Sequence, residues 1–205
     1  MEKYRDNFPL PKSYSIGEKV RKIVGIAGTI GSGKDVVSHY LAQKYGYIEI
    51  IMGDLVRDLA NELKLEPSRE NLLKLQKRYV EQFGREYWGK RAVEKIQSIA
   101  SEKIVVNGIR RIEDIKVLKQ AFINDRVVLL VIDADPKIRF ERLVKRGREG
   151  DPKNFDQFLL QELAERETFD LEELEKIADY KIENDGSLVE LYTRVDEFVN
   201  KFGLF

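Results

Sequence analysis

The stretch GIAGTIGSGKDVV, from Gly25 to Val37, contains the feature that decides the fold. Gly28 is followed by four residues and then by Gly33 and Lys34. An apolar run, KIVGIA, precedes these glycines, and apolar residues recur at helical spacing after them. A glycine-rich turn between a buried strand and an amphipathic helix is the setting in which G-x-x-x-x-G-K binds phosphate.

The physical chemistry of this loop suits a polyphosphate. Glycines let backbone N–H groups approach phosphate oxygens without obstruction, and the helix N-terminus adds partial positive charge. The ammonium group of Lys34 would bridge the outer phosphates. The nucleotide-binding residues predicted from this stretch are Gly28, Gly31, Ser32, Gly33, Lys34 and Asp35. The competing interpretation is a simple glycine turn before a helix.

Asp35 is unusual because serine or threonine is expected after the lysine of such a loop. A hard cation such as Mg²⁺ accepts carboxylate oxygen readily, either directly or through water. One interpretation is therefore that Asp35 is directed at the metal. The other is a degraded site that binds nucleotide weakly and does no chemistry.

Short apolar segments alternate with helical ones along the rest of the chain. The expected strands are 22–27, 47–51, 103–107, 126–133 and 179–184. The expected helices include 54–64, a helix starting at Pro67 and Ser68, 87–100, 136–147, 155–167, 171–177, and one opened by a capping box of Ser187 and Glu190. Strands separated by helices predict a parallel sheet covered on both faces. We expect a three-layer α/β/α fold with a five-stranded parallel sheet in one domain, 21–205, after an irregular arm, 1–20.

Composition limits the classes of partner. Lys plus Arg and Asp plus Glu number 36 each, so no overall field attracts nucleic acid or a membrane surface. There is no cysteine, which excludes disulfides and thiolate metal sites. The run Val127–Ile132 is too short to span a bilayer, and the N-terminal residues lack the apolar core of a signal peptide. We expect a cytoplasmic protein with small-molecule partners, no nucleic acid and no membrane; its oligomeric state stays open.

Four elements occur in the order found in nucleotide kinases: GIAGTIGSGKD, GDLVRDLA, VVNGIRR and FERLVKRGRE. From about residue 22 to 202 the chain resembles the P-loop nucleoside and nucleotide kinase superfamily. It is most similar to archaeal-type nucleotide kinases, deoxynucleoside monophosphate kinases and dephospho-CoA kinases. The resemblance implies ATP and Mg²⁺ as cofactors, acceptor-binding helices at about 54–100 and a lid at about 139–168.

The resemblance also implies the metal and acceptor residues. Such kinases commonly have an aspartate where this chain has Asn107, so Asp35 and Asn107 are interpreted as a compensating pair at the metal. Asp54 and Arg57 lie where the acceptor is held, and Arg57 would grip an acceptor phosphate. Arg110 follows the third strand, at the sheet edge where open α/β folds bind ligands, and is preferred to Arg111. The alternative for Asp54 is a helix N-cap.

Arginines recur in the lid segment. Arg139, Arg142 and Arg146 stand at i, i+3 and i+7, which predicts one helix face lined with guanidinium groups. Arg142 and Arg146 are the predicted catalytic residues, together with Lys34, because lid arginines cancel charge on the transferring group. Arg148 and Arg166 are further candidates, and the alternative is a surface helix with salt partners. Asn184, in the segment ENDGS, is expected beside the donor base, although Asp185-Gly186 also reads as an ordinary turn.

The expected function is ATP- and Mg²⁺-dependent phosphoryl transfer to a small phosphorylated acceptor, first a nucleoside or deoxynucleoside monophosphate. Dephospho-CoA is second, because GD stands where those enzymes tend to have DAD. Phosphomevalonate is a distant third, since only the SGKD ending is similar to the animal-type phosphomevalonate kinases. From a different class, a nucleotide-binding regulatory protein or slow ATPase stays open. A guanine-reading N-K-x-D is absent from the sequence.

Overall fold

The computed structural model describes residues 20–205, so the expected N-terminal arm, apart from Val20, lies outside the described residues. The described chain forms a five-stranded sheet in the order β2-β3-β1-β4-β5, and every neighbouring pair is parallel. The strands are β1 (Lys22–Ala27), β2 (Ile48–Ile51), β3 (Lys103–Ile109), β4 (Arg126–Asp133) and β5 (Tyr180–Glu183). The expectation of a parallel α/β sheet is confirmed.

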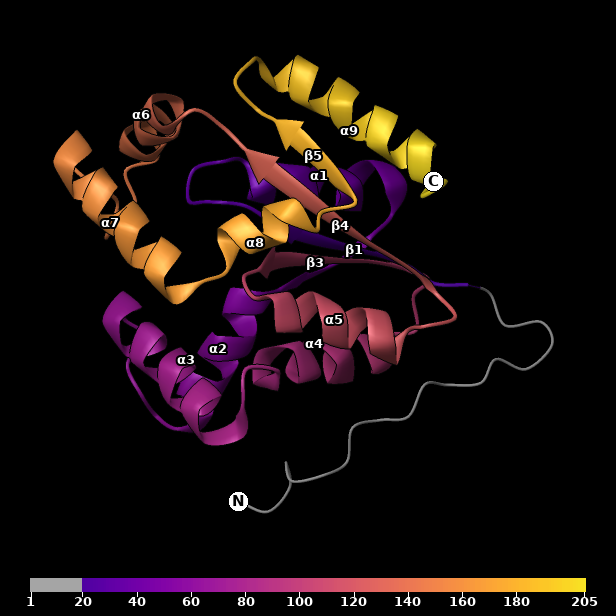
Figure 1. Cartoon of the computed structure of the whole chain (residues 1–205), viewed down its shortest axis with the longest axis horizontal. Coiled ribbons are helices and arrows are strands. Elements are labelled where there is room, and N and C mark those ends of the chain that lie inside the picture. Colours follow the sequence, from indigo (N-terminus) through magenta and orange to yellow (C-terminus); the bar gives the residue numbers. More distant parts are fainter. Residues whose placement is uncertain (1–19) are drawn as a thin grey trace.

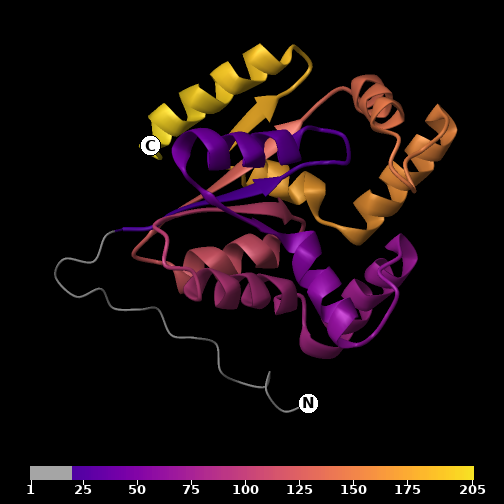
Figure 2. The same ribbon diagram turned by 180° about the vertical axis from the view of Figure 1, so that it is seen from behind.

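Helices cover both faces of this sheet (Figures 1 and 2). Their bounds are α1 (Lys34–Tyr45), α2 (Met52–Glu62), α3 (Arg69–Phe83), α4 (Tyr87–Gln97), α5 (Ile112–Ala121), α6 (Pro136–Arg146), α7 (Phe155–Thr168), α8 (Leu171–Lys176) and α9 (Leu188–Phe202). In Figure 1, α1 and α9 lie on one side of the sheet and α4 and α5 on the other. The three-layer arrangement is therefore also confirmed.

Local signals in the sequence start several helices. The Asp135 carboxylate accepts the N–H of Lys137 at 2.8 Å, and Pro136 occupies the first turn of α6. The capping box of Ser187 and Glu190 begins α9. The helix after β2 is different, because it begins at Met52 instead of residue 54. Asp54 consequently lies inside its first turn and is not the N-cap.

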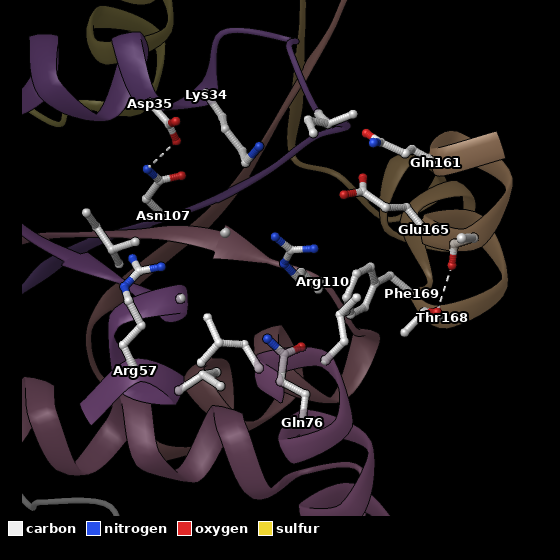
Figure 3. A pocket seen from close by; sticks show the side chains of 18 of the residues that line it. Lys34, Asp35, Arg57, Gln76, Asn107, Arg110, Gln161, Glu165, Thr168 and Phe169 are labelled. Atoms are coloured by element: carbon white, nitrogen blue, oxygen red, sulfur yellow. Dashed lines mark hydrogen bonds between the residues drawn. The ribbon is translucent and has the colours of Figure 1, made fainter. Parts of the chain in front are cut away.

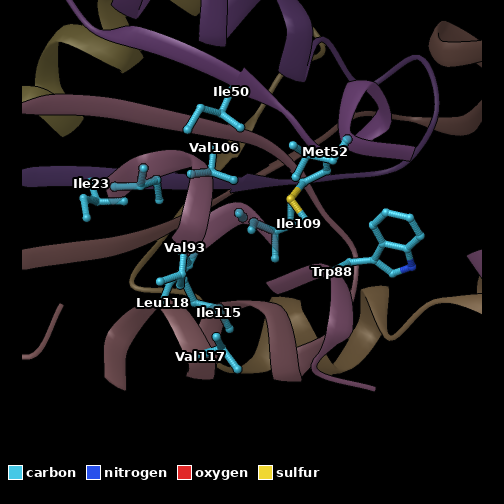
Figure 4. Packing of buried hydrophobic residues seen from close by; sticks show 14 of the residues in the cluster. Ile23, Ile50, Met52, Trp88, Val93, Val106, Ile109, Ile115, Val117 and Leu118 are labelled. Atoms are coloured by element: carbon cyan, nitrogen blue, oxygen red, sulfur yellow. The ribbon is translucent and has the colours of Figure 1, made fainter. Parts of the chain in front are cut away.

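Two clusters of buried apolar side chains hold the layers together. The cluster on the side of α4 and α5 includes Val93 and Leu118 against Ile23 and Val106 of the sheet (Figure 4). The cluster on the side of α1 and α9 includes Leu41 and Phe198 in the same way. Each fully buried aliphatic or aromatic side chain contributes about 1.5–3 kcal/mol. This packing fixes the positions of the strands and therefore of the polar groups at their carboxyl ends.

The strand order sets the location of the candidate site. Because all five strands are parallel, their carboxyl ends meet at one edge of the sheet. The glycine loop follows β1, Arg110 follows β3, α6 follows β4, and Asn184 follows β5. The pairs α2 and α3, and α6 and α7, project beyond the same end of the sheet (Figure 1). Their assignment as acceptor-binding helices and lid stays a prediction.

Candidate functional site

The glycine loop adopts a path that only glycine tolerates at three positions. Gly28, Gly31 and Gly33 have φ angles of +154°, +79° and +98°. A Cβ on Gly28 would lie 2.3 Å from the carbonyl oxygen of Ile132, and one on Gly33 would lie 2.4 Å from Asn184 Nδ2. The Ser32 hydroxyl is buried and, within the described part of the chain, has no hydrogen-bond partner. The loop therefore provides the tight backbone turn on which anion-binding sites are built, and beside it the Ser32 hydroxyl is available to a ligand.

Lys34 extends from this loop toward a large cavity (Figure 3). Its Nζ lies 3.4 Å from the carbonyl oxygen of Thr29, which makes a long hydrogen bond. Burial lowers the pKa of Lys34; nearby Arg110 and Arg146 lower it further, against the opposing charge of Asp35. A bound polyphosphate would supply the counter-charge that this ammonium group needs.

The cavity has a volume of about 720 Å³, within the range of small-molecule sites. The cations that line it are Lys34, Arg57, Arg110, Arg146 and Arg148, and the acids are Asp35 and Glu165. Its apolar lining includes Ile51, Val56, Leu72, Leu160 and Phe169. Positive groups thus gather in one cavity although the whole chain has a formal net charge of zero. Such a lining suits an anionic ligand that also carries an apolar or planar part.

Two of the predicted acceptor arginines lie in this cavity. The Arg110 guanidinium is centred 4.4 Å from the Phe169 ring, and Figure 3 shows both side chains facing the open space. Arg57 Nε donates to Asp54 Oδ1 at 2.9 Å. Asp54 itself is not among the described residues that line the cavity, so its contact with the site passes through Arg57. Arg111 is buried and donates instead to the carbonyl oxygen of Thr168.

A carboxylate missed by the sequence reasoning supports Arg110. Asp114, in the first turn of α5, accepts the backbone N–H groups of Arg110 at 3.3 Å and Arg111 at 3.1 Å. Burial raises the pKa of Asp114 to about 6, while these two N–H groups act in the opposite direction. Asp114 is the third residue of α5, and an acidic side chain at this position commonly accepts backbone N–H groups at the start of a helix. The sequence therefore contained a sign of this capping role.

The structure separates the lid arginines that were expected to share one helix face. Arg139 is buried and donates to the carbonyl oxygen of Ala134 at 2.9 Å and to Glu162 Oε1 at 2.6 Å. Arg142 Nη2 donates to the carbonyl oxygen of Asn184 at 2.8 Å and lies outside the residues described as lining the cavity. Arg146 does line it. All three stand on α6 at the expected spacing, but their guanidinium groups do not gather at one place, because each long side chain turns toward a different acceptor.

The remaining lid arginines also differ from each other. Arg146 Nε donates to Asp151 Oδ2 at 3.0 Å, and Asp151 also accepts the N–H of Arg148 at 2.9 Å. Arg148 lines the cavity together with Arg146. Arg166 forms ion pairs with Glu162 and Glu172 and lies outside the described cavity lining. Asp151 therefore holds the lid segment in which the two cavity arginines lie.

Asn184 supports the glycine loop. Its Nδ2 donates to the carbonyl oxygen of Ser32 at 2.8 Å, and its own N–H donates to the carbonyl oxygen of Asp133 at 2.7 Å. The side chain is 6% exposed. Through its N–H groups Asn184 therefore supports the glycine loop, and its contact with the donor base stays a prediction. This support of the loop by Asn184 was not predicted, because it depends on a contact between residues that are 152 positions apart in the sequence.

Asp35 and Asn107 are in direct contact, as their proposed pairing requires. Asn107 Nδ2 donates to Asp35 Oδ1 at 3.0 Å and also lies 3.5 Å from Glu49 Oε1. Asn107 is 2% exposed, and its Oδ1 is buried without a hydrogen-bond partner in the described chain. A carboxylate and an unsatisfied amide oxygen fit a hard cation such as Mg²⁺. No group of three or more His, Cys, Asp or Glu side chains in residues 20–205 is arranged to hold a metal by itself.

Comparisons with known proteins agree with this geometry. Residues 24–170 match the AAA domain family. The chain is 33% identical over 181 residues to a UPF0200 protein of Hyperthermus butylicus, covering 88% of this chain and 95% of that protein. It is 35% identical over 170 residues to a UPF0200 protein of Staphylothermus marinus, covering 83% and 87%.

Solved structures give the same fold. TT1252 from Thermus thermophilus aligns with a TM-score of 0.59 at 21% identity, over 89% of this chain and 98% of that one. Shikimate kinase from Acinetobacter baumannii aligns with a TM-score of 0.56 at 15% identity, over 90% and 96%. A gluconokinase from Sinorhizobium meliloti also gives 0.56, at 16% identity, over 90% and 94%. These low identities establish the fold alone, which is that of P-loop kinases.

Across the described residues, no helix is both long and apolar enough to cross a bilayer.

Proposed function

The chain belongs to the UPF0200 family and has the P-loop kinase fold, and from this premise we propose that it transfers a phosphoryl group from ATP, with Mg²⁺, to a small phosphorylated acceptor. One observation carries the proposal. A single cavity combines Lys34 of the phosphate loop with Arg57 and Arg110 on one side and with Arg146 and Arg148 on the other. A nucleotide switch or ATPase can also use arginines at the transferring phosphate, but it has no acceptor for Arg57 and Arg110 to hold.

The donor side of the site is the loop itself. Gly28, Gly31 and Gly33 shape the cradle, Ser32 offers a free hydroxyl, and Lys34 would meet the outer phosphates. Asn184 braces the loop from beneath. We assign Arg142 to the edge of the donor site, beside Asn184, because its guanidinium lies there and not in the cavity. Arg146 is then the lid arginine that we assign to the transferring group.

The acceptor side is the part of the cavity between α2, α3 and α7. Arg57 and Arg110 would hold an acceptor phosphate, because guanidinium groups match phosphate oxygens in charge and shape. Gln76, Leu72 and Phe169 line the neighbouring space and would meet a base-sized ring. A nucleoside or deoxynucleoside monophosphate therefore remains the first choice of acceptor, with dephospho-CoA as the alternative.

The chemistry asked of the protein is positioning and charge neutralisation. An acceptor oxygen would attack the γ-phosphorus, and the bond from phosphorus to the β–γ bridging oxygen would break, releasing ADP. Lys34 and Arg146 would offset the charge on the transferring oxygens, and Arg57 with Arg110 would hold the acceptor in line. Asp35 and Asn107 would hold Mg²⁺, which when bound neutralises charge on the β- and γ-phosphates.

The test measures ADP release from ATP and Mg²⁺ with each of a panel of nucleoside monophosphates, deoxynucleoside monophosphates and dephospho-CoA. One acceptor class should raise the rate at least tenfold and appear as its phosphorylated product in chromatography. A Lys34→Met variant is the control for contaminating kinases. ADP release that is the same with every acceptor would instead identify a slow ATPase.

A further inference from the structure

Glu49 of β2 is a second acidic side chain beside the Asn107 amide that contacts Asp35. Asn107 Nδ2 donates to Asp35 Oδ1 at 3.0 Å and lies 3.5 Å from Glu49 Oε1. The three residues come from α1, β2 and β3, so only the folded chain brings them together. Asn107 Oδ1 remains buried and unsatisfied within residues 20–205, and Asn107 is part of the cavity lining.

The pairing register of β2 with β3 explains why Glu49 lies near Asn107 and Asp35. Glu49 lies opposite Val105 in the parallel pairing of β2 with β3. Val105 packs in the apolar cluster on the α1 side, whereas Ile50 packs in the cluster on the opposite side. Because side chains alternate along a strand, Glu49 points to the α1 side, toward the end of that helix where Asp35 lies. Glu49 is partly buried, between the apolar Val105 opposite it and the polar pair of Asn107 and Asp35.

The local electrostatics favour a cation at this point. Two carboxylates that share one amide donor repel each other, and a cation beside them reduces this repulsion; Lys34 already lies near Asp35. A buried acceptor such as Asn107 Oδ1 also destabilises the fold until a ligand satisfies it. Both needs are met by a hard divalent cation, which binds carboxylate and amide oxygens.

We propose that Glu49 adds a second carboxylate beside Asp35, so that Asp35 and Glu49 together hold the divalent cation of the bound nucleotide. Asn107 positions both carboxylates through its amide. Asp35 with Asn107 already carries the single negative charge of the usual hydroxyl–aspartate pair, so Glu49 makes this site more negative by one charge. This inference rests on the proposed nucleotide site and adds to it a residue that no sequence motif indicated.

The test is Glu49→Gln, which removes the charge and keeps the size of the side chain. The dissociation constant of Mn²⁺ is measured by electron paramagnetic resonance in the presence of a non-hydrolysable ATP analogue. The variant should bind Mn²⁺ about 10- to 100-fold more weakly than the wild type. The analogue without metal should bind equally well to both proteins, because Lys34 and the loop are unchanged. Circular dichroism checks that each variant is folded.

A double variant separates a charge role from a structural one. Glu49→Gln combined with Asn107→Asp returns a carboxylate to β3 and should recover Mn²⁺ affinity to within about threefold of the wild type. Glu94→Gln, an exposed acid on α4 at the opposite side of the sheet, is the matched control and should change nothing.

Two results would overturn the inference: Mn²⁺ affinity unchanged in Glu49→Gln, or no recovery in the double variant. Either result leaves the proposed function standing if the wild type binds the analogue and Mn²⁺. A wild type that binds neither would overturn both proposals.

Discussion

Arg139 Nη2 donates to Glu162 Oε1 at 2.6 Å, and both side chains are buried. The same guanidinium donates to the carbonyl oxygens of Ala134, before α6, and Ile30, in the glycine loop. Glu162 belongs to α7. One buried arginine therefore connects the phosphate loop to both helices that follow β4.

Removing one partner of this ion pair should lower the stability of the folded protein. Glu162→Ala leaves a buried guanidinium without its carboxylate and should lower the free energy of unfolding by about 3–5 kcal/mol. Urea denaturation measures this. Arg166→Ala is the control, because Arg166 contacts the same carboxylate from an exposed position and should cost no more than about 1 kcal/mol. Equal losses in both variants would contradict the assignment of Arg139 as the connecting residue.

Lys34 should show opposite effects on stability and binding. Burial lowers its pKa, so the folded protein holds the Lys34 proton less tightly than the unfolded chain does, and the charged form opposes folding near neutral pH. Lys34→Met should therefore raise the Tm of the ligand-free protein, by about 2–4 °C for each kcal/mol of penalty removed. The same variant should lose the rise in Tm that ATP produces in the wild type.

Differential scanning fluorimetry with and without ATP records both effects of Lys34→Met. Lys74→Met, at an exposed position of α3, should leave the ATP-induced rise intact. A ligand-free Tm that falls in Lys34→Met would show that the ammonium group stabilises the free protein.

Asp114 should make stability depend on pH in a defined window. Its pKa is raised by burial from 3.8 to about 6, so the folded state holds the proton more tightly than the unfolded state. The stability from this group is therefore present below about pH 4 and is lost as the pH rises to about 6. Asp114→Asn has no such titration. From pH 4 to pH 7 its stability relative to the wild type should rise by about 2–3 kcal/mol, because each pKa unit corresponds to about 1.4 kcal/mol. Parallel profiles in urea denaturation at these pH values would refute the assignment.

Arg110 should act on the acceptor and not on the donor. Arg110→Ala removes a charged hydrogen-bond donor and should raise the KM for the acceptor about 10- to 100-fold, with the KM for ATP changed less than threefold. Phe169→Leu removes only the ring beneath the guanidinium and should raise the same KM about two- to fivefold. Steady-state kinetics with each substrate varied in turn measures both. A rise in the KM for ATP with the acceptor KM unchanged would place Arg110 at the donor instead, and an equal rise in both would contradict a role specific to the acceptor.

Much of the architecture was predictable because its signals are local. The glycine spacing from Gly28 to Gly33 dictates a loop that other residues cannot follow, and the alternation of apolar strands with helices dictates a parallel sheet. The caps at Asp135 and Ser187 are also local, since each involves a side chain and a backbone group three or fewer residues away. The helix start at Met52 was missed because Ile51 offers no side-chain cap to read.

The sequence by itself determined the phosphate loop and the alternation of strands and helices that gives three layers, whereas the acceptor and lid cations were expected only from the resemblance to nucleotide kinases. It determined the loop and the alternation because hydrophobic periodicity and glycine geometry act over a few residues. Only the tertiary structure decided which arginine is buried, that Asn184 braces the loop, and that Glu49 and Asp35 meet at Asn107. Those outcomes depend on the order of the strands in the sheet and on where α7 packs. In each case the side chain contacts a partner that is distant along the chain.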